Sequence, residues 1–441
     1  MVARAADRAQ GPPRGPAPSL DGIEGLAASN LPGVPLTRDA SVTQLFLELV
    51  AVPSPSRRER VVGELIREWL AGHGVTSAFD EAGAVNGSDA GNLIATVPGA
   101  AGAPTYLFVA HMDTVETGTP AITPSVGQDG VIRSDGQTIL GADNKAAVAA
   151  VMRVCAAAAK TPEAERPTVH AAFTCCEESG KMGAGLLAPE LLADVDSAFS
   201  VDGAKPVGTV ITRALGQASF AFVIHGRAAH AAANPEAGVN AIAVASAIVS
   251  ALPLGRQPGG GSVNVAAILG GSVVDRLTLE NLAAGGVEAA LHSALTNSVP
   301  DRALVRGEVR GYSEQEMEDT VRVITDTIAR VCDARGAGHE WIRDRSRMVP
   351  PFPHAADSLA RALVQAAATR VDGLRVVLEE RQATLEANYL AASTDVVALA
   401  SGSRDPHQVS ESIPVAELER LEALLVAILS ASPDAARTAA A

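Results

Sequence analysis

Five residues whose side chains commonly bind metal ions are spread along the 441-residue chain: His111, Asp143, Glu178, Asp202 and His407. Three of them follow apolar runs of strand length, residues 106–110, 169–176 and 198–201. Because ligands of open α/β sheets gather outside the carboxyl ends of strands, we expect these side chains to meet at one edge of a sheet. Imidazoles and carboxylates without a thiolate suit zinc, manganese or cobalt, and a pair of such ions makes a hydrolase centre.

Two further features suggest how the ligands are arranged. Asp113 stands two residues after His111, so its carboxylate is expected to hold the second ring N–H of the imidazole. Asp143 precedes an alanine-rich stretch, residues 146–160, that is predicted to be a helix. The two oxygens of this carboxylate can bridge two cations about 3.5–4 Å apart. We therefore expect Asp143 to be the bridging ligand and Asp113 to orient His111.

A pair of acids, Glu177 and Glu178, follows the third apolar run. Adjacent side chains on an extended chain point to opposite sides, but a turn at the strand end can bring both towards one centre. One glutamate can then bind metal while the other accepts a proton from the attacking water. We expect Glu178 to be the ligand and Glu177 the general base.

These segments, together with residues 46–56, 91–95 and 411–414, resemble the M20 family of metallopeptidases and amidohydrolases, and within it the peptidase T-like branch. The resemblance covers the chain from about residue 41 to 421. It implies an α/β catalytic domain, with a mixed central sheet flanked by helices, and an inserted smaller α+β lid or dimerisation domain. It also implies two divalent metal ions, with His407 as the last ligand.

Residues 226–231 and 234–242 resemble the signature of the inserted domain. In relatives that dimerise through this domain, the matching His reaches the partner's active site and stabilises the oxyanion, which implies that role for His230 and a homodimer. Arg310 matches an Arg that often receives a substrate carboxylate, as a planar guanidinium can. Two alternatives stay open: His230 could only cap a helix, and Arg310 could pair with Glu308.

The predicted organisation has three parts. Residues 1–37, rich in Ala, Pro and Gly, form a flexible arm. Residues 38–215 and 351–441 form the catalytic domain around the two metals. Residues 216–350 form the lid, with strands at 217–224 and around Trp341 and with helices at 235–252 and 314–334.

Two stretches depart from the family pattern. Residues 272–298 separate two lid motifs that adjoin in relatives, and we expect them to form a helix pair broken at Gly285-Gly286 that carries His292 and could cover the pocket. Relatives usually place a longer segment, with a further strand, before the last His. Here only about a dozen residues separate Asp395 from His407, which makes His407 the least secure ligand. Both departures suggest a remodelled substrate pocket.

Composition limits the possible partners. The formal charge of −15 and the pI near 5.1 argue against nucleic acid and anionic membranes. No run approaches the roughly 18 apolar residues of a spanning helix. The four cysteines show no CxxC spacing, and free thiols fit a reducing compartment, so we expect a cytoplasmic protein.

The predicted function is hydrolysis of a C–N bond, peptide or amide, in a small carboxylate-bearing substrate by a water held between two metal ions, with Glu177 as the base. One alternative is hydrolytic deamination of an aromatic amino acid, similar to 5-nitroanthranilate aminohydrolase in this family. An alternative of another class is a catalytically inactive, peptidase-like binding protein. The core residues do not distinguish the two chemistries or choose the metal.

Overall fold

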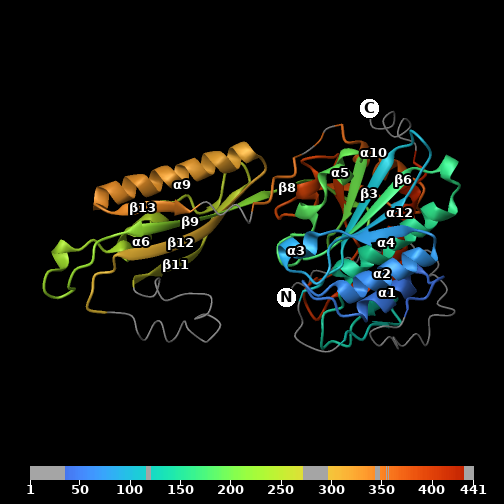
Figure 1. Ribbon diagram of the computed structural model, residues 1–441, viewed down its shortest axis with the longest axis horizontal. Helices are drawn as coiled ribbons and strands as arrows, with labels where there is room; N and C mark the ends of the chain where they lie inside the picture. Colours follow the sequence, from blue (N-terminus) through green and yellow to red (C-terminus); the bar gives the residue numbers. More distant parts are fainter. Residues whose placement is uncertain are drawn as a thin grey trace, which may run out of the picture.

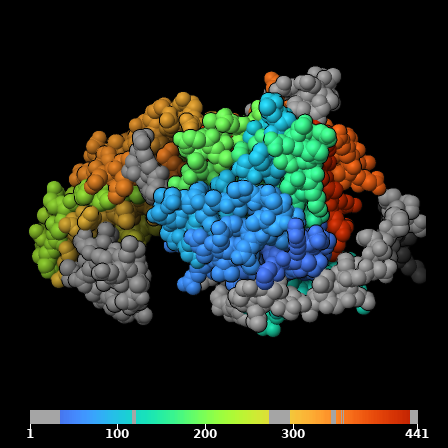
Figure 2. Space-filling view, turned by 45° about the vertical axis from the view of Figure 1, so that its right-hand side comes forward, coloured from blue at the N-terminus to red at the C-terminus, as the bar shows by residue number. Residues whose placement is uncertain are grey.

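The chain forms two lobes, a larger one around an eight-stranded sheet and a smaller one around a five-stranded sheet (Figure 1). The computed structural model describes residues 35–115, 121–271, 296–342, 348–353, 355 and 357–431. Figure 2 shows the first helices, in blue, on the surface of the larger lobe, with the olive and orange segments of the smaller lobe beside it. None of the described helices is long and apolar enough to cross a membrane.

The larger sheet is mixed. Its strands run in the order β1 (Thr76–Phe79), β2 (Leu93–Val97), β6 (Thr168–Thr174), β3 (Thr105–His111), β7 (Ser197–Val201), β15 (Val396–Leu399), β8 (Thr209–Ala214) and β14 (Val377–Arg381). β3 is parallel to β6 and β7, and β15 is parallel to β7. The carboxyl ends of these four strands therefore lie along one edge of the sheet, where a ligand can be held between them.

Both faces of the larger sheet are covered. Alternate residues of β3 point to opposite faces, so Phe108 joins one core cluster while Leu107 and Val109 join another. The first cluster includes residues of α1 (Val42–Val50), α2 (Arg60–Gly72), α3 (Ala82–Asn86), α4 (Ala142–Lys160), α10 (Leu359–Ala368) and α12 (Val415–Ile428). The second includes residues of α5 (Pro189–Ala193) and α11 (Ala387–Leu390).

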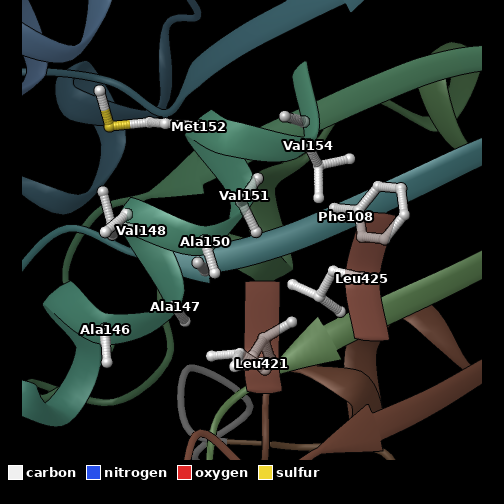
Figure 3. Packing of buried hydrophobic residues seen from close by; sticks show 14 of the residues in the cluster. Phe108, Ala146, Ala147, Val148, Ala150, Val151, Met152, Val154, Leu421 and Leu425 are labelled. Carbon is white, nitrogen blue, oxygen red and sulfur yellow. The ribbon is translucent and has the colours of Figure 1, made fainter. Parts of the chain in front are cut away.

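The alanine-rich sequence of α4 explains its central place. Alanine favours helix strongly and leaves little side-chain bulk, so neighbouring elements approach α4 closely. Val151 and Val154 of α4, Leu421 and Leu425 of α12, and Phe108 of β3 belong to one core cluster, in which Phe108 lies beside Leu425 (Figure 3). A small sheet of β4 (Ser125–Val126), β5 (Val131–Arg133) and β16 (Ser412–Pro414) joins the start of α12 to the chain before α4.

The smaller lobe is an antiparallel sheet with two helices. Its strands run in the order β10 (Gly255–Arg256), β11 (Ser262–Gly270), β12 (Arg302–Gly311), β9 (Gly216–His225) and β13 (Gly338–Ile342). α6 (Ala241–Ala251) and α9 (Glu314–Arg335) share one apolar cluster with β9, which contains Phe220 and Phe222. Phe220 also stacks on Trp341, with ring centroids 5.7 Å apart. This α+β lobe is the lid that the sequence predicts.

Two crossings connect the lobes, and they run side by side. Ala214 pairs with Phe352, and Gln217 pairs with Val349, in antiparallel bridges. The buried side chain of Asn388 donates one hydrogen bond to the carbonyl of Leu215 (3.0 Å) and another to that of Pro350 (2.8 Å). One residue of the larger lobe thus holds both crossings.

Several expected elements differ from the structure or lie outside its described residues. The lid helix expected from residue 235 begins at Ala241, because the Asn240 side chain accepts a hydrogen bond from the Ala243 N–H and caps the helix there. The stretch between Asp395 and His407 contains the strand β15. The expected helix pair at 272–295, with His292, lies outside the described residues, as do residues 1–34 and 432–441.

Candidate metal centre and active site

The edge of the larger sheet carries the residues that the sequence singled out. His111 is the last residue of β3, Glu177 and Glu178 lie in the turn after β6, and Asp202 follows β7. Most residues of these strands are buried and apolar, and the acids and His111 stand at or just after the strand ends. Asp143 comes from the loop that opens α4, across a cis peptide bond to Asn144.

Asp143 lies between the two histidines. Its Oδ1 is 3.1 Å from Nε2 of His111, and its Oδ2 is 3.5 Å from Nε2 of His407. His407 Nε2 is also 2.9 Å from Oε1 of Glu178. One ligand atom from each of His111, Asp143 and Glu178 lies within 4.8 Å of the others, the spacing that a shared cation needs. The structure thus brings four of the five expected ligands into direct contact.

Asp202, the fifth, is buried but is not part of that grouping. Burial, together with the negative charges of Asp143 and Glu177, raises its pKa to about 7. Burial likewise raises the pKa of Glu178 to about 8, with Asp143 and Glu177 adding repulsion. Oxygen and imidazole donors crowded in this way are stabilised by cations, so the residues present fit a site for divalent metal ions.

Asp113 contacts both His111 and the turn that carries Glu177 and Glu178. The ring N–H that is expected to meet the Asp113 carboxylate faces the Asp113 carbonyl instead: Nδ1 of His111 lies 3.0 Å from that carbonyl oxygen and 3.5 Å from Oδ1 of the carboxylate. A carbonyl can only accept, so Nδ1 carries the proton and Nε2 is free to bind metal. The Asp113 carboxylate accepts hydrogen bonds from the backbone N–H groups of Glu177 (3.0 Å) and Glu178 (3.1 Å). Burial opposes the charge of this carboxylate, but the His111 ring beside it lowers its pKa. Asp113 therefore fixes the ligand and the acidic pair together.

His407 lies in the loop before β16 and is half exposed. Hydrogen bonding to Asp143 raises its pKa to about 9. The backbone φ of His407 is 65°, a left-handed conformation that is uncommon for a residue with a side chain. In this conformation the His407 imidazole contacts Asp143 and Glu178. His407 therefore remains in the candidate ligand set.

Three charged residues that sequence reasoning missed support the site. Lys181 places its Nζ 2.9 Å from Oε1 of Glu177. Glu386 accepts a hydrogen bond from Thr174 at the end of β6 (2.6 Å). Glu411 accepts three backbone hydrogen bonds, from Leu140, Gly141 and Asp143. Glu411 lies in a matched family segment, but nothing in its sequence context indicates which backbone it holds.

The two lid residues lie away from this group. Nδ1 of His230 accepts hydrogen bonds from the N–H groups of Ala232 and Ala233, both at 3.2 Å. Nε of Arg310 is 2.8 Å from Oε1 of Glu308, so the alternative pairing with Glu308 is the one formed. Within the described part of this single chain, neither residue forms a hydrogen bond or an ion pair with the five candidate ligands.

Comparison with known proteins identifies the family of the chain. The family model described as peptidase family M20/M25/M40 matches residues 107–431. The uncharacterized protein YqjE of Bacillus subtilis (strain 168) is 29% identical over 395 residues, which span 89% of this chain and 99% of YqjE.

Two solved structures are also similar. The aminopeptidase PepT from Bacillus cereus ATCC 10987 is 31% identical with a TM-score of 0.75, covering 88% of this chain and 97% of PepT. A tripeptidase from Staphylococcus aureus subsp. aureus Mu50 is 27% identical with a TM-score of 0.75, covering 88% and 97%. The family model matches residues 107–431, which make up most of the chain. The chain therefore belongs to the M20 family of peptidases.

Proposed function

We propose that this protein is a dinuclear metal-dependent hydrolase that cleaves the C–N bond of a short peptide or amide bearing a carboxylate. The observation that carries the proposal is the position of Asp143, whose two oxygens face two different imidazoles. A carboxylate placed in this way suits a bridge between two cations. Membership of a peptidase family supports the reaction class.

The residues that would hold the ions are His111, Asp143, Glu178, Asp202 and His407. Zinc, manganese or cobalt fits this set of nitrogen and oxygen donors. When bound, two such ions lower the pKa of water towards neutrality and polarise a carbonyl group. Asp113 would keep the His111 tautomer and the turn that carries Glu177 and Glu178 in the binding geometry.

Glu177 is the proposed general base. Its side chain is 6% exposed, lies beside the candidate ligands and is not one of the grouped donors. It would take a proton from the attacking water and return it to the leaving nitrogen. A buried carboxylate with one strong partner can do this because it is held in a single orientation.

Two lid residues would bind the substrate. Nδ1 of His230 accepts hydrogen bonds from backbone N–H groups, so the ring proton is on Nε2. Nε2 is therefore a hydrogen-bond donor. A donor of this kind can stabilise an oxyanion, and we propose that it does so in the partner's active site of a homodimer. Arg310 would bind the substrate carboxylate, with Glu308 as its partner in the free enzyme.

The test is turnover by protein freed of metal and then loaded with Mn²⁺ or Zn²⁺, against dipeptides, tripeptides, N-acyl amino acids and aminobenzoates. Cleavage of peptides or acyl amino acids that stops with chelator is the expected result. The tripeptidase and aminopeptidase names of two similar proteins favour short peptides. Release of ammonia from an aminobenzoate, with peptides untouched, would replace amide hydrolysis by deamination. No turnover of any substrate by metal-loaded protein would favour the binding-protein alternative.

A further inference from the structure

We infer that Lys181 is a positioning residue that acts on the reaction through Glu177, by holding the carboxylate of the base in its working orientation. The inference rests on the proposed function, in which Glu177 is the base. Nζ of Lys181 lies 2.9 Å from Oε1 of Glu177. Among the described residues, Lys181 is the one whose side chain forms an ion pair with that carboxylate.

The turn between the two residues is built to bring them together. The backbone N–H groups of Gly180 and Lys181 both donate to the carbonyl of Glu177, over 2.9 and 2.6 Å. Lys181 has a φ of 59° and Gly180 a φ of 128°. A long side chain at positive φ is strained, and such strain persists where surrounding contacts hold it. Here the backbone hydrogen bonds to the Glu177 carbonyl hold the turn, and the ion pair then places the ammonium beside the carboxylate of the base.

The charges around Lys181 explain why the pair is stable. The Lys181 side chain is 20% exposed and the Glu177 side chain 6% exposed. Burial opposes the charge of Lys181, but Glu177, Asp202 and Glu386 all raise its pKa. Without the ammonium, Glu177 would be a nearly buried anion beside other acids and would lose its fixed orientation.

Orientation is what the base must have. A proton can be taken in one step only from within hydrogen-bonding distance, and a displacement near 1 Å can cost on the order of 10²-fold in rate. A lysine that orients the base should therefore change kcat, whereas a lysine that binds substrate should change KM.

The experiment is a double-mutant cycle on metal-loaded protein with Lys181→Met, Glu177→Gln and the double variant. Lys181→Met is expected to lower kcat on the order of 10²-fold with little change in KM. In the Glu177→Gln background the same substitution should cost nothing further, because the group it positions is gone. Lys181→Arg should recover much of the lost rate, since a guanidinium can also pair with the carboxylate.

Two controls separate this role from a structural one. Metal content, measured by mass spectrometry of the purified variants, should equal that of the wild type. Lys160→Met, at the exposed end of α4, should keep wild-type kinetics.

The inference is overturned if Lys181→Met raises KM and spares kcat, if it loses metal, or if its effect is undiminished in the Glu177→Gln background. If the wild type is active, Glu177→Gln is inactive and Lys181→Met is unaffected, the inference is wrong. The proposed function is not contradicted by that result. An inactive metal-loaded wild type would contradict the proposed function instead.

Discussion

The carboxylate of Glu411 accepts a hydrogen bond of 2.9 Å from the backbone N–H of Asp143, across 268 residues of sequence. It also accepts the N–H groups of Leu140 and Gly141, at 2.8 and 2.7 Å. The loop that presents the candidate bridging ligand is therefore held by one buried acid of the C-terminal part of the chain.

The first prediction concerns this acid. Glu411→Gln replaces one acceptor oxygen by an NH₂ group that faces N–H donors, so the loop should shift. Residues that orient ligands typically contribute 10–100-fold to metal affinity, and we expect a loss of about that size. Competition with a fluorescent chelator measures it, and Glu419→Gln, exposed on α12, is the matched control. Unchanged affinity in Glu411→Gln would show that Asp143 is positioned without it.

A second prediction separates chemistry from metal binding. Glu177→Gln should lower kcat by about 10²–10⁴-fold, the usual contribution of a general base, and should keep the full metal content because Glu177 is not among the proposed ligands. Steady-state kinetics and elemental analysis of the same preparation provide both values. Full turnover in this variant would contradict the proposed mechanism.

The third prediction uses metal removal. Without cations, the acids around Asp143 repel one another, and their burial raises the pKa of Glu178 and Asp202. Metal that binds only the folded chain should stabilise it by about 2.7 kcal/mol when its concentration is 100 times Kd. Chemical unfolding with and without Mn²⁺ measures this gain. An Asp143→Asn variant should show little of it, and an equal gain there would place the ions elsewhere.

A fourth prediction concerns the two subunits of the proposed homodimer. His230→Ala and Glu177→Gln should each be inactive alone, but a mixed dimer contains one site with both residues intact if His230 acts across the interface. Equal mixing after dissociation should then recover about a quarter of wild-type activity. Activity that stays at the level of the separate variants would assign His230 to its own subunit or to no site.

The fifth prediction tests how the lobes are joined. Asn388→Ala leaves the carbonyls of Leu215 and Pro350 without this donor, and each buried group left unsatisfied costs about 1–3 kcal/mol. Urea unfolding should show the loss, whereas Asn264→Ala, exposed on β11, should change stability little. A neutral Asn388→Ala would mean that water replaces the side chain at the crossings.

The sequence predicts the main features of the site because strand ends are visible in it. Apolar runs of strand length before His111 and Asp202 lead directly to the edge where parallel strands end. The lid also follows from pattern, since Ser313 and Gly336 mark the two ends of α9.

The supporting residues could not be found in this way. Glu411 holds backbone N–H groups, which every residue except proline offers, so no partner in the sequence marks it. Glu386 meets Thr174 across 212 residues of sequence, so no local pattern links them. The start of α6 differs from the prediction because Val239 pairs with Arg227, so the chain is extended there and the helix begins only after Asn240. Local propensity does not contain such contacts.

The paired crossings beneath the lid have a consequence for how the enzyme can vary. Because the chain leaves and re-enters the larger lobe at bridged neighbours, Ala214 and Phe352, the lid is a long loop whose ends are already closed. The entropy of closing a loop grows only with the logarithm of its length, so lengthening the surface loops of this lobe adds little to the cost of closing it. The loops of the smaller lobe can therefore change in length while the strand ends that carry His111 and Asp202 stay in place.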